Sequence, residues 1–134
     1  MNEGTTVLHI AVSKWFWRMA TEAIRIRSNE TYRSEIFDDV VAEIALATPE
    51  PKCATDLLRR HLEIIPSSGP IELTLHISEK AADNLAAVSH QIAHQLASTA
   101  TVTDAISLLL YDFIATHHAD KILGAVDDAL GKPN

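Results

Sequence analysis

Two short segments of the chain alternate apolar and polar residues with a period of two. Residues 6–12 read TVLHIAV, and residues 71–77 read IELTLHI. Because side chains on a strand point alternately to its two faces, this period predicts two half-buried β-strands. Ser13 and Ser78 directly follow these segments. Serine is a favoured helix N-cap, so the sequence predicts that a helix begins after each strand.

A helical period follows both serines. Apolar and small residues recur at steps of three and four, which marks one buried stripe in each predicted helix. The stripe in residues 14–27 comprises Phe16, Met19, Ala20, Ala23 and Ile26, and that in residues 79–97 comprises Ala82, Leu85, Ser89, Ile92 and Leu96. Polar segments at residues 28–31 and 98–101 then predict turns. A second helix is expected after each turn.

The two halves have the same predicted order of strand, capped helix, turn and helix. Residues 34–45 align without a gap on residues 103–114. The distance from Ser13 to Ser34 is four residues shorter than that from Ser78 to Thr103. Four residues are about one helical turn, so we expect the first helix of the second half to be one turn longer. The pattern indicates a diverged duplication.

Proline-rich breaks divide the chain into three parts. We expect a first unit over residues 1–48, a linker over 49–69 and a second unit over 70–134. The linker should hold a connecting helix through Leu57, Leu58 and Leu62. Residues 119–130 should form an extra helix or extend the preceding one. The predicted fold class is mainly α with a short β-ribbon.

Composition favours a globular protein of the cytoplasm. A chain of 134 residues with 47% apolar side chains is large enough for one compact domain or two small fused halves. Its single cysteine, Cys53, cannot form an internal disulfide, which favours a reducing compartment. The start of the chain does not resemble a secretory signal, and no apolar run is long enough to span a bilayer. We therefore expect no membrane partner.

The charge distribution bears on nucleic-acid binding. The net charge is −7, divided into −3 over residues 1–50, +1 over residues 51–69 and −5 over residues 70–134. Nucleic-acid binders usually carry a basic surface. The first half and the linker are therefore the more suitable surface for phosphate contacts.

One segment resembles a known family. Residues 32–41, YRSEIFDDVV, are similar to the second-helix signature of ribbon-helix-helix DNA-binding proteins of the Arc/MetJ type, in which arginine-serine, an acidic residue and spaced aliphatic residues recur. The likeness covers residues 5–47 and 70–118. It implies a tandem ribbon-helix-helix pseudo-dimer in one chain, similar to relaxosome accessory proteins of bacterial conjugative plasmids. A generic helical domain with two incidental strands is the alternative.

The resemblance implies a DNA-binding face. Two antiparallel strands would enter the major groove, which is wide enough for a two-stranded ribbon. The side chains facing the helices would be Leu8, Ile10, Val12, Leu73, Leu75 and Ile77. Those facing the bases would be Val7, His9, Ala11, Glu72, Thr74 and His76. None of these six is the arginine, lysine, asparagine or glutamine that family members place there, so a solvent-exposed ribbon face is the alternative.

Phosphate contacts would come from the starts of the second helices, where backbone amides and the helix dipole favour anions. The residues expected there are Thr31, Arg33 and Ser34 in the first half and Thr101 and Thr103 in the second, and Lys14 is a further expected phosphate contact. Helix capping alone would also explain the hydroxyl groups among them.

Other chemistry finds little support in the sequence. His90 and His94 have a spacing that can hold a metal, with His117 and His118 as further ligands, but a solvated pair is the simpler interpretation. There is no glycine-rich phosphate loop, paired-carboxylate site or Ser/His/Asp arrangement. We expect no catalytic residues, no cofactor and no enzyme. Trp15, Phe16 and Trp17 lie in the first turn of a predicted helix, so not all three can face the core. We expect one to cap the ribbon and another to anchor an interface, and core packing of at least two is the alternative.

Two functions follow as hypotheses. The first is a sequence-specific DNA-binding protein, either a transcriptional regulator or a plasmid or phage DNA-processing accessory factor, with double-stranded DNA as its partner. The second is a degenerate ribbon-helix-helix scaffold whose acidic surface binds a protein partner, as an inhibitor or assembly component. A second copy of the chain is a further candidate partner.

Overall fold

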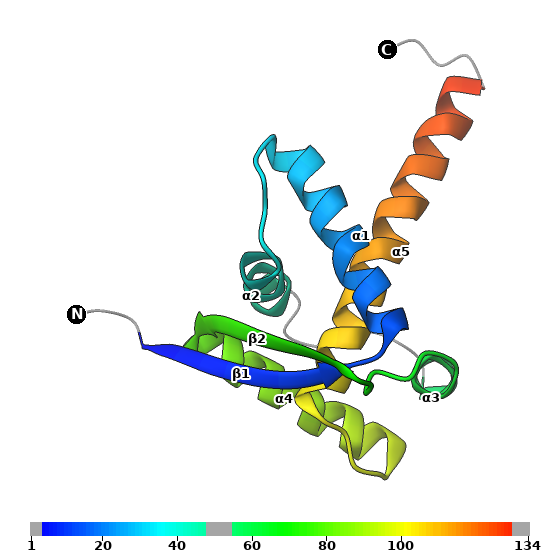
Figure 1. The fold of residues 1–134 in the computed structure, drawn as a ribbon. Helices are drawn as coiled ribbons and strands as arrows, with labels where there is room; N and C mark the ends of the chain where they lie inside the picture. Colours follow the sequence, from blue (N-terminus) through cyan, green and yellow to red (C-terminus); the bar gives the residue numbers. More distant parts are fainter. Residues whose placement is uncertain (1–3, 48–54, 130–134) are drawn as a thin grey trace.

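The computed structural model of the protein describes residues 4–47 and 55–129. The elements, in chain order, are β1 (Thr5–Val12), α1 (Lys14–Thr31), α2 (Phe37–Ala47), α3 (Thr55–Ile64), β2 (Ile71–Ser78), α4 (Glu79–Leu96) and α5 (Val102–Ala129) (Figure 1). The predicted fold class, mainly helical with a short ribbon, is confirmed. Within the described ranges, no helix has the length and apolar character needed to cross a membrane.

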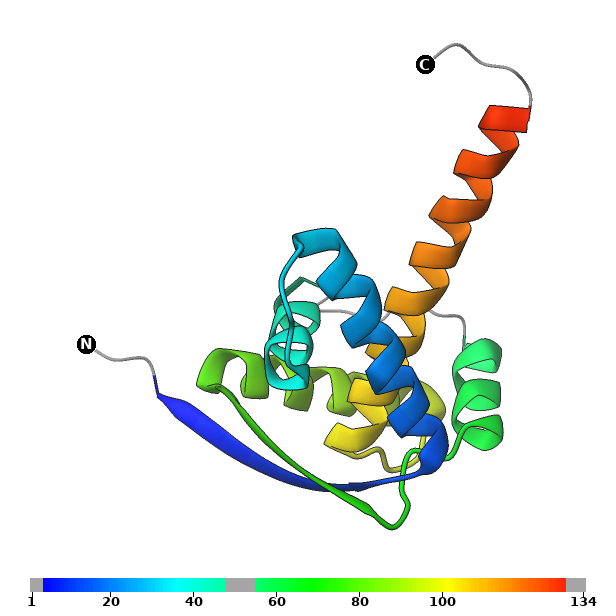
Figure 2. The same cartoon turned by 45° about the horizontal axis from the view of Figure 1, so that its top comes forward.

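The two strands pair with each other in one antiparallel sheet. Leu8 lies opposite Leu75, and His9 lies opposite Thr74. Exposure alternates along both strands, as the period of two predicts. The side chains predicted to face the helices are buried or half-buried, and Figure 2 shows the ribbon along one edge of the molecule with the helices on one side. The predicted faces of both strands are therefore confirmed.

Serine caps the helix that follows each strand. The Ser13 hydroxyl accepts a hydrogen bond from the Phe16 amide at 3.0 Å, and the Ser78 hydroxyl accepts one from the Ala81 amide at 3.2 Å. Each bond satisfies one of the amides that a helix start leaves unpaired. Both predicted N-caps are confirmed.

An offset of 65 residues relates the elements of the two halves. It takes Ser13 to Ser78 and Phe37, the first residue of α2, to Val102, the first residue of α5. Helices α1 and α4 are both 18 residues long, and each ends before a residue in the left-handed conformation. The predicted one-turn difference between these helices is therefore wrong, as is the alignment of residues 34–45 with 103–114.

The error lies in where the first helix ends. The sequence predicted a turn at residues 28–31, but α1 continues to Thr31 and turns at Tyr32. The Thr31 hydroxyl donates to the Arg27 carbonyl one turn back, and Arg27 lies 3.7 Å from Glu30 in an ion pair three residues apart. These contacts stabilise the last turn, although serine, asparagine and threonine favour turns in isolation.

The core lies between the ribbon and the helices. The second helices bury equivalent positions at the same offset of 65 residues, which are Val40, Val41, Ile44 and Ala45 in α2 and Ala105, Ile106, Leu109 and Leu110 in α5. All of these except Ala105 form one cluster beneath the strands, together with Phe16 of α1 and Leu85 of α4. The two halves therefore share one continuous core.

The linker packs against both halves. Leu58 of α3 is fully buried with Val88, Ile92 and Leu108, as the predicted connecting helix requires. Downstream, the Ser67 carbonyl accepts from the Ser13 amide at 3.0 Å, and the Gly69 amide donates to the Ala11 carbonyl at 3.2 Å. These bonds fix the linker along the end of β1.

Gly69 is required by this close approach. A Cβ atom at residue 69 would lie only 2.7 Å from the Ser13 amide nitrogen and 2.7 Å from the Val12 carbonyl oxygen. Both are backbone atoms that cannot move aside without disturbing the ribbon. The glycine therefore lets the linker meet β1.

Helix α5 is much longer than its counterpart in the first half. The position equivalent to Ala47, the last residue of α2, is Asp112, and α5 continues from there to Ala129. The predicted C-terminal segment is thus an extension of the preceding helix. It projects away from the other elements (Figures 1 and 2). Ile122 and Leu123 on this extension are 63% and 62% exposed.

Candidate nucleic-acid interface

The outer face of the ribbon carries the six side chains predicted to face DNA. Val7, His9 and Ala11 of β1 and Glu72, Thr74 and His76 of β2 are all exposed. Opposite pairs across the ribbon join Val7 to His76, His9 to Thr74 and Ala11 to Glu72. The six form one strip two side chains wide, on the face away from the core. Their role in binding DNA stays a prediction.

The middle of this strip is polar. His9 Nδ1 lies 3.3 Å from the Thr74 hydroxyl across the strands. An imidazole and a hydroxyl can each donate or accept a hydrogen bond, so the pair can bind either a donor or an acceptor on a base edge. Glu72 adds a carboxylate, which can accept from a cytosine amino group but repels phosphate.

Helix α2 contacts the edge of the ribbon through a carboxylate. Asp38 accepts a hydrogen bond from the backbone amide of His76 at 2.7 Å, and His76 Nδ1 lies 3.7 Å from the same oxygen. The bond fixes the first turn of α2 against β2. This contact could not be predicted from local patterns, because the two residues are 38 positions apart.

The start of α5 holds the phosphate-contacting residues predicted for the second half. The Thr101 hydroxyl accepts from the Asp104 amide at 3.1 Å, and Asp104 accepts from the Thr101 amide at 3.0 Å. This reciprocal pair is a capping box. Asp104 also accepts from the Ser67 hydroxyl. Thr103 lies half-buried in the same turn.

Of the phosphate-contacting residues predicted for the first half, Lys14 is the first residue of α1, but Thr31, Arg33 and Ser34 do not lie at a helix start. Thr31 is the last residue of α1, and Arg33 and Ser34 lie in the segment before α2. The first turn of α2 instead carries Asp38 and Asp39. Carboxylates at the positive end of the helix dipole stabilise the helix but oppose an approaching phosphate.

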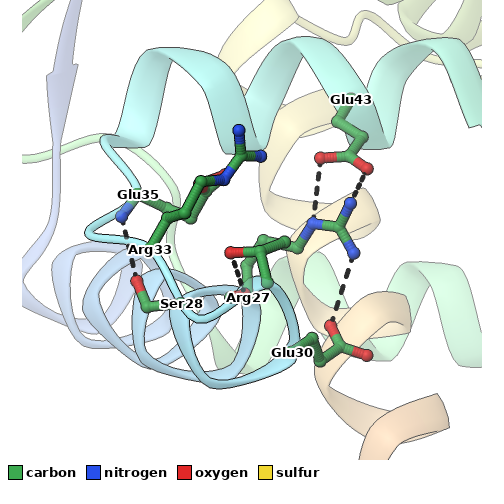
Figure 3. Close-up of polar contacts among 7 residues, drawn as sticks. Arg27, Ser28, Glu30, Arg33, Glu35 and Glu43 are labelled. Carbon is green, nitrogen blue, oxygen red and sulfur yellow. Dashed lines mark hydrogen bonds and ion pairs between the residues drawn. The ribbon is translucent and has the colours of Figure 1, made fainter.

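Three of the arginines in the first half are paired with carboxylates. Arg27 donates to Glu43 at 2.9 Å, and Arg33 Nε lies 3.6 Å from Glu35 (Figure 3). Arg25 pairs with Glu22 three residues earlier on α1. The hydrogen bond from Arg25 lowers the pKa of Glu22, and the same bond raises the pKa of Arg25.

The remaining cations of the first half gather at the start of α1. The Lys14 ammonium and the Arg18 guanidinium each lie 5.1 Å from the ring centroid of Trp15. Trp15 and Trp17 are both 44% exposed, whereas Phe16 is fully buried. The prediction that not all three aromatic residues face the core is therefore confirmed, and the alternative of core packing for at least two is wrong, because helical geometry directs only Phe16 inward. Lys14 lies two residues after the end of β1, so this cationic cluster borders the ribbon.

The four histidines weighed as possible metal ligands do not come together in one group. His90 and His94 are exposed on α4, and the rings of His117 and His118 stack edge to face at 5.8 Å on α5. Over residues 4–47 and 55–129, no three His, Cys, Asp or Glu side chains form a group that could hold a metal ion. Cys53 lies outside the described residues.

A buried histidine that the sequence did not single out lies between α3 and α5. His61 is 8% exposed, its Nε2 lies 3.1 Å from the Ser107 hydroxyl, and its ring lies 4.8 Å from that of Tyr111. Its Nδ1 has no hydrogen-bond partner among the described residues. Burial lowers the pKa of His61, and the negative charge of Asp104 partly opposes this shift.

Comparison of the chain with protein-family models, with curated proteins and with solved structures finds no match.

Proposed function

We propose that the chain is a single-chain ribbon-helix-helix protein that binds double-stranded DNA by inserting the β1–β2 ribbon into the major groove. The observation that carries the proposal is the antiparallel pair of strands with one face on the core and six exposed side chains on the other. A two-stranded ribbon fits the major groove of B-DNA.

The recurrence of elements at a constant offset supports a pseudo-dimer. The N-cap serines, the ends of α1 and α4 and the starts of α2 and α5 are all 65 residues apart. With this offset, His9 and Thr74 are equivalent residues, and they also lie opposite each other in the ribbon. In a pseudo-dimer, the two-fold axis that relates the halves would therefore pass between His9 and Thr74.

Few basic side chains of the first half are free to contribute to the affinity for DNA. Arg25, Arg27 and Arg33 are already paired with carboxylates, whereas Lys14 and Arg18 contact only the Trp15 ring in the described contacts. Lys14 lies two residues after the end of β1, and Arg18 contacts the same Trp15 ring as Lys14. We therefore expect these two residues to supply most of the phosphate neutralisation that comes from the first half.

The test is a salt titration of binding to a labelled native-locus duplex and to random duplexes. Replacing Lys14→Gln and Arg18→Gln together should flatten the slope of log K against log salt by up to about two units, since each neutralised phosphate contributes about 0.9. Arg25→Gln, on the same helix but paired with Glu22, is the matched control and should change the slope little. His9→Ala and Thr74→Ala should alter the ranking of sequences while leaving the slope unchanged.

A specific observation also favours the second candidate, a scaffold that binds a protein partner. Asp38 and Asp104 lie at the helix starts where phosphates would bind, and both already accept hydrogen bonds from the chain itself. Absence of salt-dependent association with any duplex at low ionic strength would refute DNA binding and leave this second function in its place.

A further inference from the structure

A groove of about 400 Å³ lies between the C-terminal half of α1, α2 and α5, and no residue of the ribbon lines it. Its floor is apolar and comes from Val40, Ile44, Leu109 and Phe113. These side chains belong to or pack against the main core, so the floor is fixed in place. The groove is thus a preformed hollow separate from the predicted DNA-binding face.

The rim of the groove is acidic. It carries Glu30, Glu43, Asp112 and Asp120, with Arg27 as the one guanidinium. Figure 3 shows Arg27 held between Glu30 and Glu43, with its nitrogens directed to both carboxylates. Neither Asp112 nor Asp120 has a hydrogen bond or ion pair with another described residue. The rim therefore has surplus negative charge that a cationic occupant would neutralise.

The wall formed by α5 is a helical stripe. Its residues, Leu109, Asp112, Phe113, Thr116, His117 and Asp120, follow each other at steps of three and one. They cover one side of the helix over three turns, about 16 Å. Leu123 continues this stripe three residues beyond Asp120 and is 62% exposed. Ile122, almost equally exposed, lies about 100° around the helix from Leu123.

We propose that this groove and the adjoining stripe of α5 bind an amphipathic helix of a partner protein, with apolar side chains on one face flanked by lysine or arginine. The apolar floor and Leu123 would take the apolar face, as in other helix-in-groove complexes. Asp112, Asp120 and Glu43 would pair with the flanking cations. Because the ribbon does not line the groove, the helix could bind whether or not DNA is bound.

A synthetic helix can test the chemistry with the full-length protein. The probe is a fluorescent 15-residue peptide with leucines on one face and lysines on the other, and its partner peptide has glutamate in place of each lysine. We expect anisotropy to show binding of the lysine peptide alone, with shifts of the Ile44 and Leu109 methyl signals in NMR spectra. Binding of both peptides, or shifts confined to other residues, would overturn the proposal.

Matched variants distinguish the effect of the groove's carboxylates on peptide binding from the effect of the protein's net negative charge. Asp112→Lys with Asp120→Lys should lower the affinity for the peptide at least about tenfold, whereas Glu79→Lys with Asp83→Lys on α4 makes the same charge change and should have a much smaller effect. Leu123→Ala should lower the affinity about fiftyfold, as the loss of three buried carbons at about 0.8 kcal/mol each implies, and Ile122→Ala should not. Equal effects within either pair would refute the site.

Two other occupants are distinguished by the same materials. Spermine is a polycation without a helical apolar face. If it displaces the peptide at equal concentration, the carboxylates attract any polycation, and the proposal of a helix-specific site is overturned. Sedimentation tests for a second copy of the chain. If the protein self-associates and the Asp112→Lys, Asp120→Lys variant does not, the groove binds a second copy instead. A monomer that binds the lysine peptide supports the proposal.

Discussion

Replacing Leu75→Ala tests the register on which the predicted DNA-binding face depends. Leu75 is 2% exposed and packs in the core beneath the ribbon, opposite Leu8. The substitution removes three carbons, worth about 0.8 kcal/mol each in transfer free energy, and leaves a cavity. We expect the free energy of unfolding to fall by about 2.5 to 5 kcal/mol.

The measurement is urea unfolding followed by circular dichroism. With a slope of about 1 to 3 kcal/mol per molar urea, the midpoint should fall by about 1 M or more. His76→Ala is the control, because its side chain lies on the outer face next along the same strand. Its backbone amide can still donate to Asp38, so stability should change by less than about 0.5 kcal/mol. Since a slip of one residue exchanges the two faces, equal losses in both variants would refute the register.

Two further predictions concern the linker. Gly69→Ala should destabilise the protein by about 1 to 3 kcal/mol, because the added Cβ would meet the backbone of Ser13. Gly124→Ala in α5 is the control: its added Cβ would have nothing within 4 Å, so it should stabilise the protein by up to about 1 kcal/mol. Thermal unfolding should therefore show opposite shifts of the melting temperature in the two variants. His61 has a lowered pKa in the folded state, so below about pH 6.5 the unfolded chain binds a proton that the folded chain resists, and stability should decrease as the pH falls. Comparison with His61→Gln isolates this effect, and parallel stability curves for the two proteins would contradict it.

Much of the fold could be predicted because local patterns decided it. The period of two fixed both strands and their buried faces, and Ser13 and Ser78 marked where α1 and α4 begin. The end of α1 could not be predicted, because residues 28–31 have turn-favouring side chains that the structure instead places in the last helical turn. Because of that error, the second helix was predicted to start at Ser34, although α2 starts at Phe37. Thr31, Arg33 and Ser34 were therefore predicted at a helix start where the structure does not place them.

The electrostatics of the candidate sites depend on contacts between distant residues. Arg27 and Glu43 are 16 positions apart, and Asp38 and His76 are 38 positions apart. A count of charges along the sequence treats Arg27 as a free cation, although the fold uses it to join α1 to α2. The groove on α5 was likewise hidden, because its walls come together only when three helices pack.

The pairing of β1 with β2 inside one chain makes the ribbon independent of protein concentration. When two separate chains supply the strands, dilution dissociates the ribbon, whereas here the covalent connection keeps both strands at a high effective concentration. The connection also lets the two strands differ, since a substitution in one is not copied into the other. His9 opposite Thr74 and Ala11 opposite Glu72 are such unlike pairs. The outer face of the ribbon is consequently directional, and a molecule bound to it would be held in one orientation.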